Sequence, residues 1–284
     1  MLEFSHVSAT CQHTKILTDI SVSFPTGEIT TIVGPNGCGK TTLVQCLNGV
    51  SKVTSGQIFL EHEDLLNIPL RERAKRIAFL PQVRTIIPTL PVRTLVEHGR
   101  FPHLGFSRRK TEKDREIVTR AMEFTHVESY ADQYVDTLSG GIRQRVFLAM
   151  ILAQDCDYIV LDEPTTYLDF IGQRDFLSLI RSLKENGKTV ILILHDLNQA
   201  LSLSDRLVVM QEQKIVAAGT PDTCIQSHIL EEVFHASLKQ FHDKDGTYYF
   251  FVLFIEKLQS RCLSDHDNCR CLYPCFFYFF GNIM

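Results

Sequence analysis

Short apolar runs bounded by polar or turn-forming residues recur along the chain. They lie at 29–33, 77–80, 158–161 and 188–194, and most of their side chains are aliphatic or β-branched. Runs of this length without polar alternation are typical of strands that are buried on both faces, as in a parallel sheet covered by helices. The hydrophobic pattern therefore predicts an α/β fold.

The run at 29–33 is followed by a glycine-rich turn and then by helix-forming residues. The turn, "GPNGCGKT", fits the P-loop pattern G-x-x-x-x-G-K-[ST]. Its glycines let backbone N–H groups converge on phosphate oxygens, and the helix presents its positive end to them. Lys40 would bridge the outer phosphates, and the Thr41 hydroxyl would bind Mg²⁺. The predicted ATP-binding residues of this segment are Gly34, Pro35, Asn36, Gly37, Cys38, Gly39, Lys40, Thr41 and Thr42.

The run at 158–161 ends in two carboxylates, Asp162 and Glu163. Neighbouring strand residues point to opposite faces, so the two need not do the same work. Asp162 stands where a carboxylate would hold the Mg²⁺ of a bound nucleotide, and Glu163 is placed to act as general base toward the attacking water. The alternative is a strand end that carries solvated acids and has no catalytic role.

Two further polar residues follow predicted strands. His195 comes after the run at 188–194, and Gln82 follows the run at 77–80. Since α/β sheets bind ligands at the carboxyl ends of their strands, His195 could contact a γ-phosphate or the attacking water, and the Gln82 amide could reach metal and water. Taken alone, a histidine is more often structural, and a glutamine at a strand end is usually solvated.

A second turn with the character of an anion site occurs about a hundred residues after the first. In "LSGGIRQR", Ser139, Gly140 and Gly141 supply a hydroxyl and exposed backbone N–H groups at the start of a predicted helix. The chain has one P-loop, one such turn and no internal repeat, so it carries a single nucleotide-binding module.

The composition and the net charge do not change the prediction of a single nucleotide-binding module with an α/β fold. The chain has 284 residues, of which 44% are hydrophobic and 22% charged, and a formal net charge of −4, so no excess of charge favours binding to nucleic acid. We expect no secretory signal at the start and no membrane span, because no run of eighteen or more apolar residues occurs. Nine cysteines, most of them scattered singly, are typical of reduced thiols in a cytosol.

The chain resembles the ATP-binding subunits of ABC transporters over residues 2–234. The resemblance rests on the order of six features along the chain: the P-loop, Gln82, "LSGGIRQR", "IVLDEP", "TTYLD" and His195. The resemblance implies a P-loop NTPase (RecA-like) core sheet, an N-terminal antiparallel β-subdomain and an inserted helical subdomain at about 91–152. By this resemblance, Gln82 corresponds to the Q-loop residue and His195 to the switch histidine. Residues 165–169 would lead into the D-loop. Residues 1–235 would form the nucleotide-binding domain. Residues 236–284 would form an atypical extension whose order is left open.

The amino-acid sequences of several segments indicate a particular group within this family. "VRTLVEHGRFPHLG", "LHDLNQALSLSDRLVVM" and "IVAAGTPD" look like importers of ferric siderophores, ferric citrate, haem and vitamin B12. We expect an ATPase that powers uptake of an iron(III) chelate, with haem or cobalamin import as the alternative. An exporter ATPase is the nearest rival, and a soluble ABC ATPase is the next. A non-catalytic subunit is disfavoured, since Lys40, Asp162, Glu163 and His195 are all present.

The resemblance also implies partners. Ser139 and Gly141 of one subunit would cover the γ-phosphate held by Lys40 of another, which gives a head-to-tail, two-fold dimer. The second subunit would be a copy of this chain or a relative. The segment after Gln82, through "HGRFPHLG", would dock integral-membrane permease subunits, with a substrate-binding protein acting indirectly. The chain would then lie peripherally on the cytoplasmic face of the inner membrane.

Three segments depart from the family pattern. Cys11 stands where an aromatic residue usually stacks on adenine, and His13 is a candidate substitute. Ile142 replaces a polar residue after the two glycines, where we expect it to be exposed. The tail carries Cys269, Cys271, Cys275 and "FFYFF", for which metal binding, a membrane contact or a terminus outside the family pattern remain open.

Overall fold

A computed structural model describes residues 1–11, 14–82, 87–105, 109–243 and 246–253. A six-stranded sheet with the order β10-β9-β3-β8-β7-β6 forms its centre. These strands are β3 (Ile29–Val33), β6 (Ile77–Leu80), β7 (Tyr158–Asp162), β8 (Thr189–Ile193), β9 (Arg206–Gln211) and β10 (Lys214–Gly219). Five of them are parallel, and β10 joins at the edge antiparallel to β9. The predicted α/β fold is confirmed.

The strands β3, β7 and β8 are buried on both faces, which explains their continuous apolar sequences. Alternate residues enter two different cores, because successive side chains point to opposite faces of the sheet. On β7, Ile159 and Leu161 belong to one core, and Tyr158 and Val160 belong to the other. The sheet is therefore the layer that separates the two cores.

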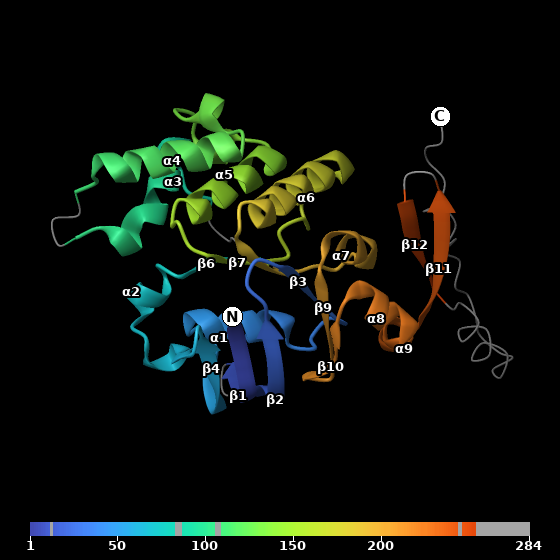
Figure 1. Ribbon diagram of the computed structural model, residues 1–284. Coiled ribbons are helices and arrows are strands. Elements are labelled where there is room, and N and C mark those ends of the chain that lie inside the picture. The colour runs from blue at the N-terminus through green and yellow to red at the C-terminus, as the bar shows by residue number, and fades with distance from the viewer. Residues whose placement is uncertain (12–13, 83–86, 106–108, 244–245, 254–284) are drawn as a thin grey trace, which may run out of the picture.

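One core lies between the central sheet and a second, antiparallel sheet with the order β2-β1-β4-β5. Its elements are β1 (Leu2–Cys11), β2 (Thr14–Phe24), β4 (Lys52–Leu60), β5 (Glu63–Asp64) and the helix α1 (Lys40–Asn48). Figure 1 shows β1, β2, β4 and α1 together at the lower side of the molecule. This is the small N-terminal β-subdomain that the family resemblance implies.

The other core packs helices against the opposite face of the sheet. The helices between β6 and β7 are α3 (Val92–Glu97), η2 (His98–His103), α4 (Glu112–Phe124), η3 (Glu128–Tyr130), η4 (Val135–Thr137) and α5 (Gly140–Leu152). Two short helices, η1 (Leu65–Asn67) and α2 (Leu70–Arg73), precede β6, and Leu65 of η1 belongs to the first core. Figure 1 shows α3, α4 and α5 grouped on the side of the sheet away from β1 and β2. The inserted helical subdomain is thus present, and α5 is the helix that the second turn begins.

A buried ion pair holds this helical group together. Arg100 Nε donates to Asp114 Oδ1 over 2.9 Å, and Arg100 Nη1 donates to the Ala153 carbonyl over 2.8 Å. Asp114 also closes a capping box with Thr111 at the start of α4. Burial raises the pKa of Asp114, but the Thr111 N–H and hydroxyl and the Arg100 guanidinium outweigh it and bring that pKa to about 2. Arg100 therefore ties α4 to the end of α5.

The last part of the described chain contains elements that the sequence analysis did not predict. After α6 (Phe170–Glu185), α7 (Leu197–Leu203), α8 (Pro221–Gln226) and α9 (Ile229–Phe234), the strands β11 (Ala236–Asp243) and β12 (Gly246–Leu253) form an antiparallel pair. Leu238, Tyr249 and Phe251 pack against the core that contains the helices. The beginning of the 236–284 extension is thus a hairpin packed on the core, and 254–284 lie outside the described residues.

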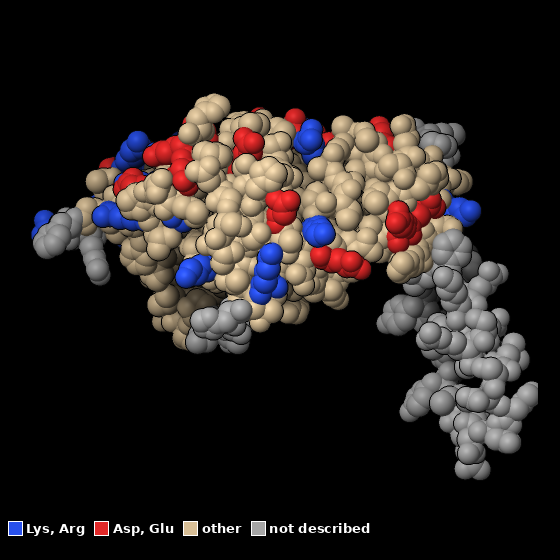
Figure 2. Space-filling model, turned by 90° about the horizontal axis from the view of Figure 1, so that it is seen from below, with Lys and Arg blue, Asp and Glu red and all other residues tan. Residues whose placement is uncertain are grey.

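In the part of the chain that is described, no helix is both long and apolar enough to cross a membrane. Figure 2 shows the face seen from below, where basic and acidic side chains share the surface with wide neutral areas. This mixture agrees with the small net charge of −4.

Candidate nucleotide site

The P-loop leaves β3 and passes so close to β9 that only glycine fits at its first position. A Cβ on Gly34 would lie 2.2 Å from the Met210 carbonyl oxygen. At the other end of the turn, Gly39 has φ 104° and forms the N-cap of α1, with no side chain that caps the helix. The first N–H groups of α1 are therefore directed out of the helix end, where an anion is stabilised.

Lys40 is the first residue of α1 and is only 6% exposed. Its ammonium donates to the carbonyl oxygens of Gly34 over 2.8 Å and Pro35 over 3.1 Å. The lysine is thus held by the turn to which it belongs. A buried ammonium in this position provides a positive charge that is already desolvated and oriented before any phosphate arrives.

Thr41 and Asp162 face each other at the end of the P-loop. The Thr41 hydroxyl donates to Asp162 Oδ1 over 3.3 Å, and Asp162 is 1% exposed. Burial raises the pKa of Asp162 to about 6, against the smaller opposing effect of the Thr41 hydrogen bond. Hydroxyl and carboxylate oxygens are ligands that Mg²⁺ prefers, so this pair fits that ion.

Glu163 follows the last residue of β7 and has a left-handed backbone, with φ 48°. Its N–H donates to the Ile193 carbonyl of the neighbouring strand over 3.1 Å. The residue is 9% exposed, and the Thr166 hydroxyl lies 3.3 Å from Oε2. The chain therefore turns sharply after the strand and fixes the carboxylate beside the sheet edge.

Gln82 and His195 both contact this carboxylate. Gln82 Nε2 donates to Glu163 Oε2, and His195 Nε2 contacts Oε1. The sheet order explains the convergence: β6, β7 and β8 are neighbours and parallel, so the residues that follow them meet at one edge. The two residues that carried the weakest signal in the sequence thus share one partner.

The second turn is built differently. Ser139 and Gly140 are exposed, and Ser139 Oγ accepts the Ile142 N–H at the start of α5 over 3.5 Å. The serine thus caps its own helix. Ile142 is half-buried and packs against the core, so the expectation that its side chain is exposed was wrong.

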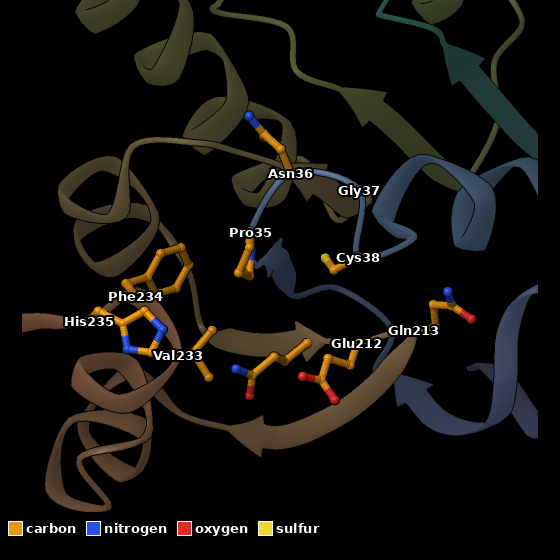
Figure 3. Close-up of a pocket in the computed structure, with 10 residues that line it drawn as sticks. Pro35, Asn36, Gly37, Cys38, Glu212, Gln213, Val233, Phe234 and His235 are labelled. Carbon is orange, nitrogen blue, oxygen red and sulfur yellow. The ribbon is translucent and has the colours of Figure 1, made fainter.

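A cavity of about 500 Å³ lies beside the P-loop. Figure 3 shows Pro35 and Cys38 on one side of it, Glu212 and Gln213 from the turn between β9 and β10 on another, and Phe234 close to Pro35. His235 follows Phe234 and also lines the cavity. The sequence analysis missed these two rings, although "EEVFHAS" stands where the family resemblance ends. Cys11 is half-buried, and His13 lies outside the described residues.

The tail cysteines considered for a metal site also lie outside the described residues. Among the residues that are described, no group of three or more His, Cys, Asp or Glu side chains could hold a metal ion. The described cysteines are all free thiols: Cys11, Cys38, Cys46, Cys156 and Cys224.

Known proteins resemble this chain in sequence. The profile of the family described as ABC transporter matches residues 17–166. The chain is 42% identical to the ferric enterobactin transport ATP-binding protein FepC of Escherichia coli (strain K12) over 217 residues, which are 76% of this chain and 80% of that protein. It is 40% identical over 220 residues to the probable siderophore transport system ATP-binding protein YusV of Bacillus subtilis (strain 168), covering 77% of this chain and 80% of that one.

A solved structure agrees with these relatives. A chain of an ABC transporter of metal-chelate type, solved in an inward-facing conformation, superposes with a TM-score of 0.78 at 25% sequence identity. The match covers 90% of this chain and 98% of that one. The fold comparison and the family profile therefore indicate the same family.

Proposed function

Since the chain belongs to the ABC transporter family and is one of its ATP-binding ATPases, we propose that it powers the uptake of an iron(III) chelate through a separate permease. The observation that carries the catalytic part is the convergence of Gln82 and His195 on Glu163, close to the P-loop. The relatives with iron-chelate names support the class of cargo. Selectivity among siderophores, ferric citrate, haem and cobalamin would lie in the other subunits.

We assign nucleotide binding to residues 1–235. The P-loop residues from Gly34 to Thr42 would surround the phosphates of ATP. Lys40 would direct its ammonium to the outer phosphates, in place of the two carbonyl oxygens that it contacts here. The N-terminal end of α1 would add its uncapped N–H groups.

Mg²⁺ would accompany the ATP. Thr41, Asp162 and Gln82 supply a hydroxyl, a carboxylate and an amide oxygen at one edge of the sheet, a donor set that suits this ion. When bound, the ion neutralises the charge of the phosphates.

Glu163 would act as general base. A carboxylate can take a proton from water only with a free oxygen, and here Oε1 contacts His195 while Oε2 contacts Gln82 and Thr166. One of these partners must move before the water is activated. His195 has a 43% exposed side chain and is free on its solvent side, so we expect it to turn toward the γ-phosphate.

The second turn, "LSGGIRQR", which we call the signature turn, would complete the site of another subunit. Ser139, Gly140 and Gly141 sit at the start of a helix and are open to an incoming phosphate. In the head-to-tail dimer, Ser139 and Gly141 of one subunit would cover the γ-phosphate held by Lys40 of the other. ATP then favours the closed pair because it contacts both halves, and hydrolysis removes that bridge.

The permease would dock beside η2. Arg71 on α2 donates from Nε to the Pro102 carbonyl over 2.9 Å and from Nη2 to the Leu104 carbonyl, which fixes this segment. Phe101 is 55% exposed and stacks on His98 with ring centroids 4.7 Å apart. Through this contact the chain would lie peripherally on the cytoplasmic face of the inner membrane, with a substrate-binding protein acting indirectly.

The function is tested by uptake of radiolabelled iron chelates in cells that carry Glu163→Gln. We expect uptake to stop, while Glu185→Gln, on the exposed side of α6, leaves it unchanged. Uptake that continues with Glu163→Gln would contradict the proposal. Labelled haem and cobalamin in the same cells test the alternative cargo.

A further inference from the structure

Three elements beside the nucleotide site are joined by a ring of hydrogen bonds. The Thr165 hydroxyl donates to Gln199 Oε1 over 3.4 Å, and Gln199 Nε2 donates to Gln173 Oε1 over 2.7 Å. Gln173 Nε2 closes the ring by donating to the carbonyl oxygens of Leu168 over 3.1 Å and Thr165 over 3.4 Å. We refer to Thr165, Gln173 and Gln199 as the glutamine ring.

The ring connects the segments that follow two neighbouring strands. Thr165 comes two residues after Glu163, in the loop that follows β7, and Gln199 comes four residues after His195, on the helix α7 that follows β8. Gln173 lies on α6. Because His195 contacts Glu163, the glutamine ring joins for a second time the two segments that meet at the Glu163 carboxylate.

The members of the ring are partly or fully shielded from water. Thr165 is 7% exposed, and Gln173 and Gln199 are half-buried. Water competes less for the hydrogen-bonding groups of shielded side chains, so hydrogen bonds between them are stronger than exposed ones and restrict the side chains to one arrangement. The glutamine ring is therefore a fixed connection rather than a loose surface contact.

The helix α7 depends on such contacts because it is short. It has seven residues, and a helix of this length is not stable by itself. At its start, Asp196 accepts the Gln199 N–H over 3.4 Å, and near its end, the Ser202 carbonyl accepts from Arg181 Nη2 of α6 over 2.8 Å. The glutamine ring holds the start of α7, which is the end nearer to His195 in the sequence.

The proposed hydrolysis, on which the inference rests, needs His195 to leave Glu163 and turn toward the γ-phosphate. The reacting groups remain aligned in that step only if the backbone at His195 stays in place while the side chain rotates. We propose that Gln173 and Gln199 are positioning residues for this step, because they hold the start of α7 against the loop after Glu163. They act through His195 and Glu163 and are not themselves catalytic residues.

Glutamine suits this task because its amide both donates and accepts hydrogen bonds. Gln173 accepts from Gln199 and donates to two carbonyl oxygens, whereas Gln199 accepts from Thr165 and donates to Gln173. Methionine is an unbranched side chain of similar length, but its thioether cannot donate a hydrogen bond and accepts only weakly. Substitution by methionine therefore opens the ring and retains most of the packing.

The test measures ATP hydrolysis by the full chain that carries Gln173→Met or Gln199→Met. We expect each change to lower kcat about tenfold, because misplacing a reacting group is costly. The KM for ATP should stay within about twofold, because the P-loop is untouched. The double variant should be no slower than the slower single variant, since either change opens the same ring.

The matched control is Arg181→Met, which removes a second hydrogen bond between α6 and α7 at the other end of α7. It should hydrolyse ATP like the parent chain, and urea denaturation verifies that all the variants are folded. The inference is overturned if Arg181→Met lowers kcat as much as Gln173→Met, since any contact between the two helices would then suffice. It is also overturned if the glutamine variants raise the KM for ATP as much as they lower kcat.

Hydrogen exchange tests the position of the helix directly. The Ala200 N–H donates to the Asp196 carbonyl over 3.0 Å in the first turn of α7. We expect this amide to exchange faster in both glutamine variants than in the parent, because the start of the helix opens more often. Arg181→Met should leave its exchange unchanged. Equal exchange in the parent and the glutamine variants would contradict the inference.

Failure of the inference can be separated from failure of the proposed function. If Glu163→Gln hydrolyses ATP like the parent, Glu163 is not the base and the inference falls with it. If Glu163→Gln is inactive while both glutamine variants keep the parental kcat, the proposed function stands and the positioning role is wrong. A loss of rate that disappears at higher chain concentration would assign the effect to dimer association, which also overturns the inference.

Discussion

The two anion-binding turns of this chain differ in how complete they are. The P-loop has a buried lysine that contacts carbonyl oxygens of the turn, a first glycine that no other residue could replace, and the Thr41–Asp162 pair beside it. The signature turn has ordinary backbone angles, with φ −60° and ψ 157° at Ser139, and lies exposed at the surface. In the proposed function, the first turn would hold phosphate by itself, whereas the second would supply only a serine and a helix end to a phosphate that another subunit holds.

Ser139→Arg should have the largest effect on hydrolysis. We expect the ATPase rate to fall about 10²–10³-fold, as for the loss of a donor to a reacting oxyanion, because the long side chain also blocks the approach of the other subunit. ATP affinity should remain within about twofold, since the P-loop is untouched. Kinetics and fluorescent-nucleotide titration measure the two quantities. Gln133→Arg, at an exposed position in the same region, is the control. If Ser139→Arg lost ATP affinity in parallel with its ATPase rate, the two turns would not have separate roles.

Lys40→Ala should act on the first turn alone. Two or more charge-assisted hydrogen bonds to phosphate would be lost, each worth about 1.5–3 kcal/mol, so ATP should bind at least about 100-fold more weakly. Calorimetric titration measures the affinity. Lys52→Ala, on an exposed position of β4, should bind ATP normally. Unchanged affinity in Lys40→Ala would show that the P-loop does not hold the nucleotide.

Asp114→Asn should weaken the helices that carry the signature turn. It leaves Arg100, which is 4% exposed, without its charge partner, and such a loss costs about 3–5 kcal/mol. Urea denaturation measures the change in the free energy of unfolding. Glu112→Gln, which breaks the exposed pair with Arg115, should cost less than about 1 kcal/mol. Equal effects of the two variants would contradict this role of the buried pair.

The pKa of Asp162 predicts a pH dependence on the P-loop side. Because burial raises it from 3.8 to about 6, the metal-free chain is most stable with respect to this group below pH 3.8 and loses that stability as the pH rises through 6. The loss is on the order of 3 kcal/mol, so Asp162→Asn should be more stable than the parent at pH 8 and similar at low pH. Denaturation with a chelator present measures this, and an equal difference at both pH values would refute it.

Phe234→Ala should have the smallest effect. Its ring shares the cavity beside the P-loop with Pro35 and Cys38, so we expect ATP to bind about fivefold more weakly, at the low end of what a base–aromatic contact contributes. Phe241→Ala, on the exposed face of β11, is the control. If His13→Ala weakens ATP binding and Phe234→Ala does not, the base lies on the Cys11 side instead.

The sequence predicts the strands of the central sheet better than the meeting of the residues that follow them. The apolar runs predict β3, β6, β7 and β8 within a residue or two, and β3, β7 and β8 are buried on both faces, which leaves continuous apolar sequences. The meeting of Gln82, Glu163 and His195 depends on the sheet order β6-β7-β8, which no local pattern encodes. The family resemblance implied roles for Gln82 and His195 and did not give their contact with Glu163.

Other features could not be predicted for physical reasons. The burial of Ile142 depends on tertiary packing against the helical core. The strands β11 and β12 lack clear alternation, and only their contact with the core distinguishes the face of Leu238 and Phe251. Phe234 lies near the P-loop because the chain returns there after α9. Long-range packing decided each of these cases.

The central claim, that the second turn completes the site of another copy, is tested most directly by mixing two inactive variants. Lys40→Ala keeps its signature turn. Ser139→Ala keeps its P-loop and loses the serine hydroxyl without adding a long side chain that would block the other subunit, so a mixed dimer forms and contains one intact site. Random pairing at equal amounts should restore about a quarter of the unmodified ATPase rate. A mixture as inactive as either variant alone would contradict the account.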